Sequence, residues 1–242
     1  MKIRATTGFS LVEMAIVLAV IALILGTGLT LLSAQQDQGR IEDANTMLGD
    51  AREMLIGYAL SHIAVDGKPC LPCPDKTAAG GAGTPNDGQE DYTIATGACV
   101  VQEGNLPWAT LGMTPQTDPW SNRLRYRVTA AFSNKLTGIQ LSPVPSAGDI
   151  NVFDSAASVT SLVTAVPAVI LSHGKNGLGA INASGNANPV AASADEQANT
   201  DLNTSFVGHT PTPAESGYFD DQATWLSPNI LFNRLVQAGK LP

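Results

Sequence analysis

The residue with the clearest chemical question is Glu13, because it lies in a run of apolar residues that continues to about Leu32. A carboxylate in a hydrocarbon environment costs at least about 2 kcal/mol, so such a residue is by default functional and needs a partner. A positively charged amine would be a suitable partner. The alternative is that Glu13 extends towards the nearby polar interface. Glu13 is therefore a candidate for electrostatic pairing.

The other residues with catalytic potential form no recognisable catalytic pattern. His62, His173 and His209 lack the His-Glu-x-x-His spacing of metal proteases, and the sequence has no Gly-x-Ser-x-Gly elbow. Ser172 lies beside His173, but adjacent residues seldom place a nucleophile and its base correctly without a third, orienting group. We therefore expect that this protein is not an enzyme.

The three cysteines lie in or near a segment rich in glycine, proline and acids, which is expected to be a loop. Zinc usually needs four ligands, and Cys70, Cys73 and Cys99 have no histidine near them in sequence. Thioredoxin-like chemistry needs a strand before the Cys-x-x-Cys pair and a helix after it, and Pro72 and Pro74 argue against both. A structural disulfide is the simplest interpretation for an exported protein.

The N-terminal segment is predicted to span a membrane. Its apolar run from Met14 to Leu32 meets the length of about 18 residues that indicates a bilayer span. Lys2 and Arg4 precede the run and favour a cytoplasmic N-terminus, so the rest of the chain is expected to be exported. A cleaved secretory signal is the alternative, with Ser33-Ala34-Gln35 as its cleavage site, although small residues already precede the apolar core.

From Ser33 onward the helix is expected to continue in amphipathic form. Its apolar positions recur at steps of three and four, which is the spacing of one helical stripe: Ile41, Ala44, Leu48, Ala51, Leu55, Tyr58 and His62. Asp66-Gly67-Lys68-Pro69 supplies turn residues and a proline that end the helix. We therefore predict one helix from about Phe9 to about Val65.

The N-terminal motif carries a family resemblance. Gly8-Phe9-Ser10-Leu11-Val12-Glu13, followed by the apolar run, resembles the class III signal of type IV prepilins and type II secretion pseudopilins. In that family a membrane-embedded aspartyl peptidase cleaves after the glycine, and the new N-terminal phenylalanine is methylated. The resemblance implies cleavage between Gly8 and Phe9 and makes Glu13 the assembly glutamate. In a filament, the Glu13 carboxylate would pair with the Phe9 amine of a neighbouring subunit.

Three later motifs resemble a pilin-like subgroup. The stretch from Cys73-Pro74-Asp75 through Cys99 to Leu106-Pro107-Trp108 implies a Cys73–Cys99 disulfide, while pairing of Cys70 with Cys99 stays open. The segment 118–122 is similar to the Asp-Pro-Trp-Gly-Asn of pseudopilins, with serine in place of the glycine. The C-terminal Phe-Asp-Asp at 219–221 and the closing Gly-x-Leu-Pro are also typical of the subgroup.

A candidate metal site follows a predicted buried strand at 166–171. The loop that begins at Ser172 resembles the Ser-x-Gly-x-Asp/Asn-Gly turn of pseudopilins, which holds calcium in some members, although Asn176 replaces the common aspartate. Ser172 and Asn176, with Asp220 and Asp221, are therefore candidate calcium ligands, because calcium selects oxygen donors. Further acids that could complete the site are Asp195, Glu196 and Asp201. The alternative is that these are ordinary solvated acids, and no other cofactor is expected.

The charge balance limits the function classes. The chain of 242 residues has 13 basic and 21 acidic residues, a net charge of −8. Loss of Lys2 and Arg4 with the leader gives −8 − 2 = −10, which argues against nucleic-acid binding. The one basic cluster is Arg123, Arg125 and Arg127, which strand alternation places on one face that we expect to be solvated.

Together these features predict four parts: a leader at 1–8, a transmembrane and filament-core helix at 9–33, an amphipathic helix at 34–66 and an exported globular domain at 67–242. The expected fold class is α+β and pilin-like, with the long N-terminal helix packed on an antiparallel sheet. Long loops are expected, above all a surface excursion at 182–215.

The resemblance implies a structural subunit, in a minor role, of a type IV pilus or a type II secretion pseudopilus. Expected partners are the prepilin peptidase/methyltransferase, other pilin or pseudopilin subunits and the inner membrane. The expected location is the bacterial inner membrane, in single-pass form with a cytoplasmic N-terminus and a periplasmic head, and a cell-surface filament after assembly. The alternative is a membrane-tethered periplasmic binding or adhesin module that does not polymerise.

Overall fold

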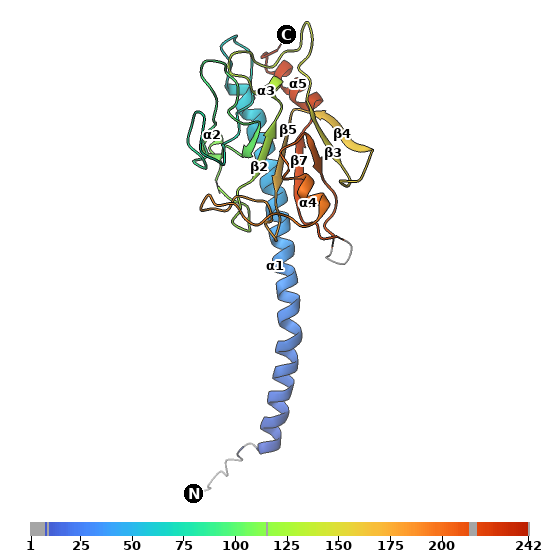
Figure 1. Cartoon of the computed structure of the whole chain (residues 1–242). Helices are drawn as coiled ribbons and strands as arrows, with labels where there is room; N and C mark the ends of the chain where they lie inside the picture. Colours follow the sequence, from blue (N-terminus) through green and yellow to red (C-terminus); the bar gives the residue numbers. More distant parts are fainter. Residues whose placement is uncertain (1–7, 9, 115, 213–216, 242) are drawn as a thin grey trace. The chain divides into compact units, whose positions relative to one another are not determined.

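A computed structural model describes residues 8, 10–114, 116–212 and 217–241, without the side chains of residues 23–34. The chain divides into two compact units, Met1–Glu42 and Asp43–Pro242. Helix α1 runs from Leu11 to Ser61 and contains the boundary between the units (Figure 1). The boundary falls inside the segment 34–66 that was predicted as the amphipathic helix.

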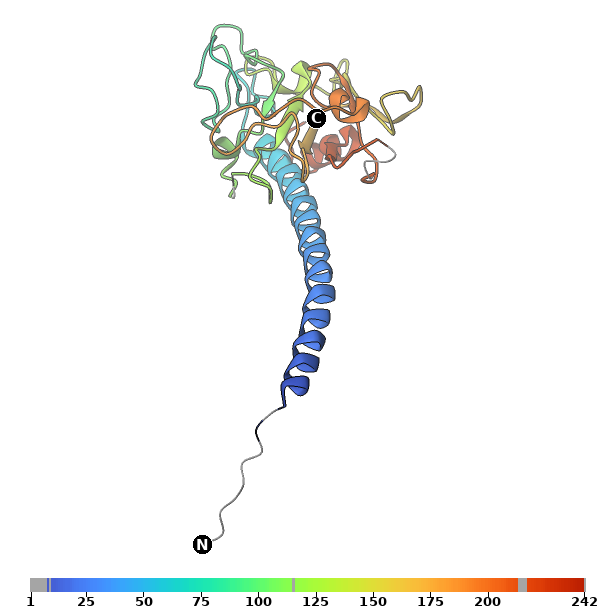
Figure 2. The same ribbon diagram turned by 60° about the horizontal axis from the view of Figure 1, so that its bottom comes forward.

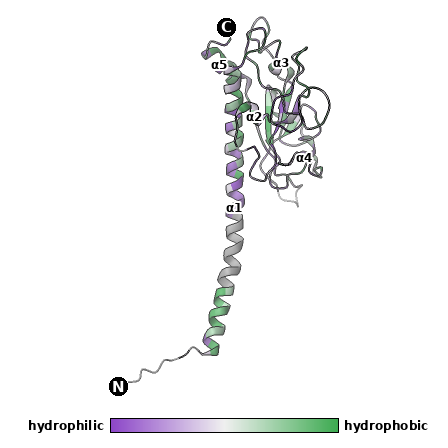
Figure 3. Ribbon diagram, turned by 90° about the vertical axis from the view of Figure 1, so that its left-hand side faces the viewer, coloured by the Kyte–Doolittle hydropathy of each residue, from purple (hydrophilic) through white to green (hydrophobic). Residues whose placement is uncertain are grey.

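The predicted transmembrane helix is contradicted. Within the described part of the chain, none of the helices combines the length and apolar character needed to cross a bilayer. The described side chains at the start of α1 cover only residues 11–22. Residues 35–43 are mostly polar, and Figure 3 colours the upper part of α1 with hydrophilic and hydrophobic residues mixed. We therefore withdraw the pilin-like fold with a transmembrane half at 9–33 and the single-pass inner-membrane location with a periplasmic head.

The second part of α1 buries its apolar stripe. Ala44, Leu48, Ala51 and Leu55 are almost fully buried, and they join one core cluster with side chains from the sheet. His62, the last member of the predicted stripe, lies beyond the end of the helix at Ser61 and is exposed. Spacing at 3.6 residues per turn therefore predicts the buried face well until the helix ends.

A four-stranded sheet covers this stripe. All its neighbouring strands are antiparallel, in the order β1 (Glu103–Asn105), β2 (Arg125–Val128), β5 (Ala168–Ser172) and β7 (Gln222–Leu226). Every residue of β5 is buried, because its alternate side chains enter two different cores. Ile170 belongs to the cluster with α1, whereas Val169 belongs to a second cluster.

The second cluster lies against a smaller sheet that the sequence did not predict. Its strands follow the order β4 (Ser161–Val166), β3 (Ile150–Phe153) and β6 (Ser205–Val207). The β3–β4 pair is antiparallel and the β3–β6 pair is parallel. The predicted antiparallel sheet is the four-stranded one, and the smaller, mixed sheet is additional to it. The fold is α+β, and the four-stranded sheet contributes to a core with α1 and to a core with the smaller sheet.

Four short helices complete the described elements: α2 (Trp108–Leu111), α3 (Ala130–Ser133), α4 (Ala194–Ala198) and α5 (Pro228–Gln237). Both α4 and β6 lie in the stretch 182–215 that was predicted as a surface loop. Ser193 begins α4 by accepting a hydrogen bond from the Glu196 N–H, a side-chain cap of the usual kind. The predicted loop is therefore partly ordered by elements too short to give a periodic signal.

The basic cluster is also not a solvated face. The Arg125 guanidinium pairs with Glu103 on β1, and Arg127 Nη1 lies 3.2 Å from Glu103 Oε2. Arg123 is nearly buried, and its guanidinium carbon lies 5.7 Å from the centre of the Trp108 ring. These contacts hold the strands and loops together, which corrects the prediction from strand alternation alone.

Candidate functional site

The N-terminal end of α1 is closed by a reciprocal pair of hydrogen bonds. The Ser10 N–H donates to Glu13 Oε2 at 2.8 Å, and the Glu13 N–H donates to Ser10 Oγ at 3.2 Å. This is a capping box, in which each side chain satisfies a backbone donor that the helix leaves unpaired. The Ser-x-x-Glu spacing of Ser10 and Glu13 is the sequence signal for this box, and the charge of Glu13 alone does not indicate it.

The predicted cleavage site lies just before this box. Gly8 is exposed, and a Cβ atom added there would meet nothing within 4 Å. Phe9 lies outside the described residues. Its amine, in a neighbouring subunit, is the expected partner of Glu13. Glu13 thus has a defined local role at the helix start.

The first turns of α1 expose apolar side chains in all directions. Leu11 is 87% exposed and Leu18 is 60% exposed. The other large apolar residues in these turns are also well exposed: Val12, Met14, Ile16, Val17, Val20 and Ile21. A helix that is apolar all round is normally covered by other groups. Full burial of one such side chain stabilises by about 1.5–3 kcal/mol, so this surface has a strong tendency to associate.

A second candidate site is a cluster of three carboxylates. Glu196 on α4 and the pair Asp220 and Asp221 each place one oxygen so that all three lie within 4.8 Å of one another. The pairing of Ser172 with Gln222 brings the end of β5 beside the start of β7, which positions Asp220 and Asp221 near the loop after β5. Glu196 is 1% exposed and Asp221 is 2% exposed, so the cluster is largely removed from water.

Hydrogen bonds satisfy only part of this cluster. Asn176 donates its side-chain amide to Glu196 Oε1 at 2.8 Å and its backbone N–H to Asp220 Oδ2 at 2.9 Å. Asn199 donates to Asp221 Oδ2 at 2.8 Å. In the described structure, the other oxygens of Asp220 and Asp221 are buried and accept no hydrogen bond, and His173 Nδ1 lies 3.4 Å from Asp221 Oδ1. Buried oxygens in this state favour a cation or a proton nearby.

The pKa shifts of Glu196 and Asp220 also favour a cation or a proton close to the cluster. Burial raises the pKa of Glu196, although the hydrogen bond from Asn176 opposes the rise and the nearby Asp221 adds to it. Burial also raises the pKa of Asp220, again with a contribution from Asp221. Three carboxylates at this distance repel one another when ionised, and a bound divalent cation would remove that repulsion.

The predicted calcium ligands therefore separate into two groups. Asp220 and Asp221 lie in the cluster with Glu196, and Asn176 borders it, but its side-chain oxygen already accepts the Leu178 N–H at 2.9 Å. Ser172 belongs to another network, because its hydroxyl donates to Asp118 Oδ2 at 2.6 Å. The two remaining acids considered from the sequence make other contacts: Asp195 with His209, and Asp201 with Asn203. The donor set of three carboxylates suits calcium, which prefers oxygen ligands.

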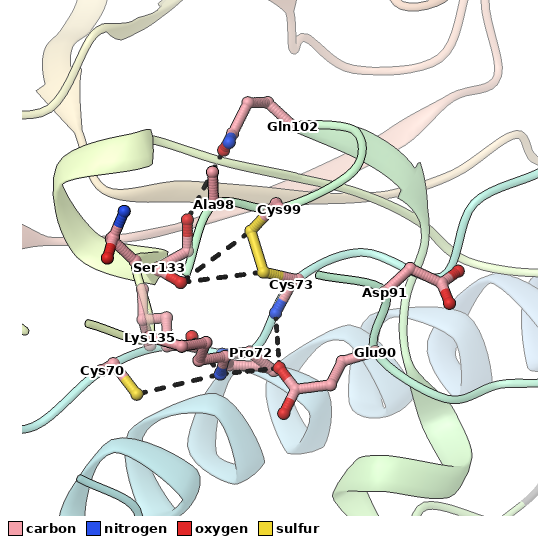
Figure 4. The surroundings of a disulfide bond; sticks show 12 residues. Cys70, Pro72, Cys73, Glu90, Asp91, Ala98, Cys99, Gln102, Ser133 and Lys135 are labelled. Atoms are coloured by element: carbon pink, nitrogen blue, oxygen red, sulfur yellow. Dashed lines mark hydrogen bonds and ion pairs between the residues drawn. A yellow bond between two sulfur atoms is a disulfide. The ribbon is translucent and has the colours of Figure 1, made fainter. Parts of the chain in front are cut away.

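The cysteines form the disulfide that the resemblance implied. Cys73 and Cys99 are bonded, with their Cα atoms 5.3 Å apart, and both sulfur atoms lie near the carbonyl oxygen of Ser133 (Figure 4). Cys70 is a buried free thiol, and its sulfur lies 3.8 Å from Lys135 Nζ. Burial raises the pKa of the Cys70 thiol, so it is poorly suited to act as a nucleophile.

Comparison with known proteins adds no relative for this chain. Neither the protein-family models, nor the curated proteins, nor the solved structures include a match.

Proposed function

We propose that this chain is a structural subunit, in a minor role, of a type IV pilus or a type II secretion pseudopilus. The observation that carries the proposal is the apolar start of α1, exposed on all sides, directly after the Gly8-Phe9 motif. Neighbouring subunits would cover this surface in a filament. Eight large apolar side chains at about 1.5–3 kcal/mol each give a gross stabilisation on the order of 10 kcal/mol, which exceeds the lower estimates for the cost of association.

The capping box gives Glu13 two compatible tasks in this proposal. One carboxylate oxygen accepts the Ser10 N–H within the subunit. An ionised carboxylate has two acceptor oxygens, so the other can accept the Phe9 amine of a neighbouring copy after cleavage at Gly8. The proposed processing partner is a prepilin peptidase/methyltransferase, and the proposed assembly partners are other pilin or pseudopilin subunits.

Two substitutions test this function. Glu13→Gln removes the charge and should strongly reduce incorporation into filaments, measured by the amount of this chain in sheared or purified filament fractions. Ser10→Ala is the matched control, because it removes the cap but keeps the carboxylate. It should destabilise the helix start by about 1 kcal/mol and leave most incorporation intact. Unchanged incorporation of the Glu13→Gln chain would contradict the role of Glu13 in assembly, and absence of the unmodified chain from filament fractions would favour a binding module that does not polymerise.

We further propose that the cluster of Glu196, Asp220 and Asp221 binds calcium as a structural ion. The supporting observation is the pair of buried aspartate oxygens that accept no hydrogen bond in the described structure. At a calcium concentration about 100 times the dissociation constant, binding should stabilise the fold by about 2.7 kcal/mol. Thermal unfolding with calcium and with a chelator measures this. Asp221→Asn should abolish the calcium shift, whereas Asp201→Asn, an exposed control, should retain it. No shift in the unmodified chain would contradict the proposal.

A further inference from the structure

The connection from α4 to β6 contains the tripeptide Asn203-Thr204-Ser205. An asparagine followed two residues later by serine or threonine, with no proline between them, is the acceptor pattern for N-linked glycosylation. The pattern is short, so the surroundings of the asparagine decide whether it can be used. A second copy of the pattern, Asn182-Ala183-Ser184, lies earlier in the chain and allows a comparison within one molecule.

The base of the loop that carries Asn203 is fixed, and its tip is exposed. The buried Asn199 donates its side-chain amide to the Val207 carbonyl at 3.1 Å and accepts the Val207 N–H at 2.8 Å. At the tip, Leu202 is 67% exposed, and Asp201 and Asn203 are exposed as well. The fold therefore holds Asn203 at the surface, on a loop with a rigid base, where an enzyme can reach it.

The side chain of Asn203 is oriented by two contacts within the loop. Its Oδ1 accepts the Ser205 N–H at 2.6 Å, a turn that brings the amide next to the serine of the acceptor pattern. Its Nδ2 donates to Asp201 Oδ2 at 2.5 Å. The nitrogen of an amide is a weak nucleophile because its lone pair is delocalised into the carbonyl, and a charge-assisted hydrogen bond to a carboxylate raises its electron density. Asp201 thus both positions and polarises the acceptor amide.

Asn182 has the same tripeptide in different surroundings. Its Oδ1 accepts two backbone N–H groups, from Ser184 at 3.0 Å and from Asn186 at 3.1 Å. Its Nδ2 donates to another amide, Asn188 Oδ1, at 3.3 Å. The side chain is partly buried, and the residue two positions before it is the buried Ala180 where the other copy has an acid. Asn182 is therefore a matched internal control for Asn203.

A groove beside Asn203 has room for a sugar. Its volume of about 490 Å³ lies within the range of small-ligand sites, and Asp201 and Asn203 are among its lining residues. Helix α4 contributes Ala194 and Ala198 to the lining, and their short side chains leave this space open. The first sugar of a glycan attached to Asn203 would lie in this groove, beside α4.

We propose that Asn203 is an N-glycosylation site, with Asp201 as the residue that orients its amide. The sugar donor is a lipid-pyrophosphate-linked oligosaccharide, and the partner is an oligosaccharyltransferase. Asn203 Nδ2 forms a bond to the anomeric carbon of the first sugar, and the bond between that carbon and the pyrophosphate oxygen breaks. The released lipid pyrophosphate takes up the proton that the amide loses. The Cys73–Cys99 disulfide is typical of exported proteins, which such transferases modify. The proposal requires neither cleavage at Gly8 nor bound calcium.

Glycosylation of the purified full chain in a mild detergent tests the proposal. The folded, disulfide-bonded chain is incubated with a purified oligosaccharyltransferase that recognises acid-x-Asn-x-Ser/Thr sequences and with its lipid-linked oligosaccharide. Mass spectrometry of the peptides should show the glycan on Asn203 and little on Asn182. Glycan on neither asparagine, or equal amounts on both, would overturn the proposal.

Matched variants separate the acceptor from its neighbours. Asn203→Gln should abolish the main modification, whereas Asn182→Gln should retain it. Asp201→Asn keeps the size of the side chain but removes its charge, and should reduce the modification roughly tenfold. Ser205→Thr, which keeps the hydroxyl, should retain the modification, and Ser205→Ala should lose it. Thermal unfolding checks that each variant is folded. Full modification of Asn203→Gln or of Asp201→Asn would overturn the proposal.

Discussion

Two stretches of the same helix carry similar apolar residues but have different surroundings. At residues 11–22 of α1 the apolar side chains are exposed on all sides, whereas at residues 43–61 one apolar stripe is buried under the sheet. Figure 2 draws α1 as one coiled ribbon through both stretches. The buried stripe is one-sided because it must pack against a single partner layer. The exposed surface is all-round, which suits contact with several partners at once.

The largest expected difference between these stretches is in folding stability. Leu55 is fully buried in the main core, so Leu55→Ala should lower the free energy of unfolding by about 2–5 kcal/mol. Leu18→Ala, at an exposed position, should change it by less than about 0.5 kcal/mol. Chemical denaturation of the detergent-solubilised chain measures both. A large loss of stability from Leu18→Ala would show that the start of α1 is already covered within one chain.

The second expected effect concerns only the globular unit. The Cys73–Cys99 bond closes a separation of 26 residues, and removing such a link should lower stability by about 3 kcal/mol. The paired change Cys73→Ser with Cys99→Ser should therefore reduce the unfolding free energy of the globular unit in the same denaturation experiment. Cys70→Ser is the matched control for burying a hydroxyl. If both variants lost equal stability, the loss would reflect polar burial and not the missing bond.

The third prediction concerns pH. Asp75 accepts hydrogen bonds from the backbone N–H groups of Asn86 and Gly88, yet burial raises its pKa to about 6. The folded state then holds more protons than the unfolded state between about pH 4 and pH 6, so stability falls as the pH rises through that window. The contribution is on the order of 3 kcal/mol, because one pKa unit corresponds to about 1.4 kcal/mol.

Asp75→Asn tests this pH effect. The variant has no ionisable group at this position, so its stability deficit relative to the unmodified chain should be largest near pH 4 and should shrink towards pH 7. Parallel denaturation curves at several pH values measure the difference. A deficit that stays constant across this range would contradict the raised pKa of Asp75.

The sequence predicted local features better than contacts between distant segments. The spacing of Ala44, Leu48, Ala51 and Leu55 depends only on helix geometry, so the buried stripe could be deduced. Glu103 pairs with Arg125 and Arg127 through the register of β1 and β2, and no local pattern shows that register. The basic cluster was therefore misinterpreted as a solvated face.

The cluster of Glu196, Asp220 and Asp221 also depends on contacts between distant segments, which the sequence does not show. The resemblance covered only the loop that begins at Ser172. Asp220 and Asp221 were named as downstream acids that could complete the site, and Glu196 was one of several further acids. Its place in the cluster depends on α4, a helix of five residues in a stretch with little periodicity. Ser172 was grouped with the wrong acids, because its hydroxyl contact with Asp118 joins segments 54 residues apart in sequence.

The measurement that tests the proposed function most directly is mass spectrometry of the N-terminal peptide of the chain isolated from its native cells. The proposal predicts a peptide that begins at Phe9 and carries a methyl group on its amine. With Leu in place of Gly8, the same peptide should be lost and the leader retained. A mature chain that still begins at Met1, or that begins after residue 33, would contradict the proposed processing and assembly through the start of α1.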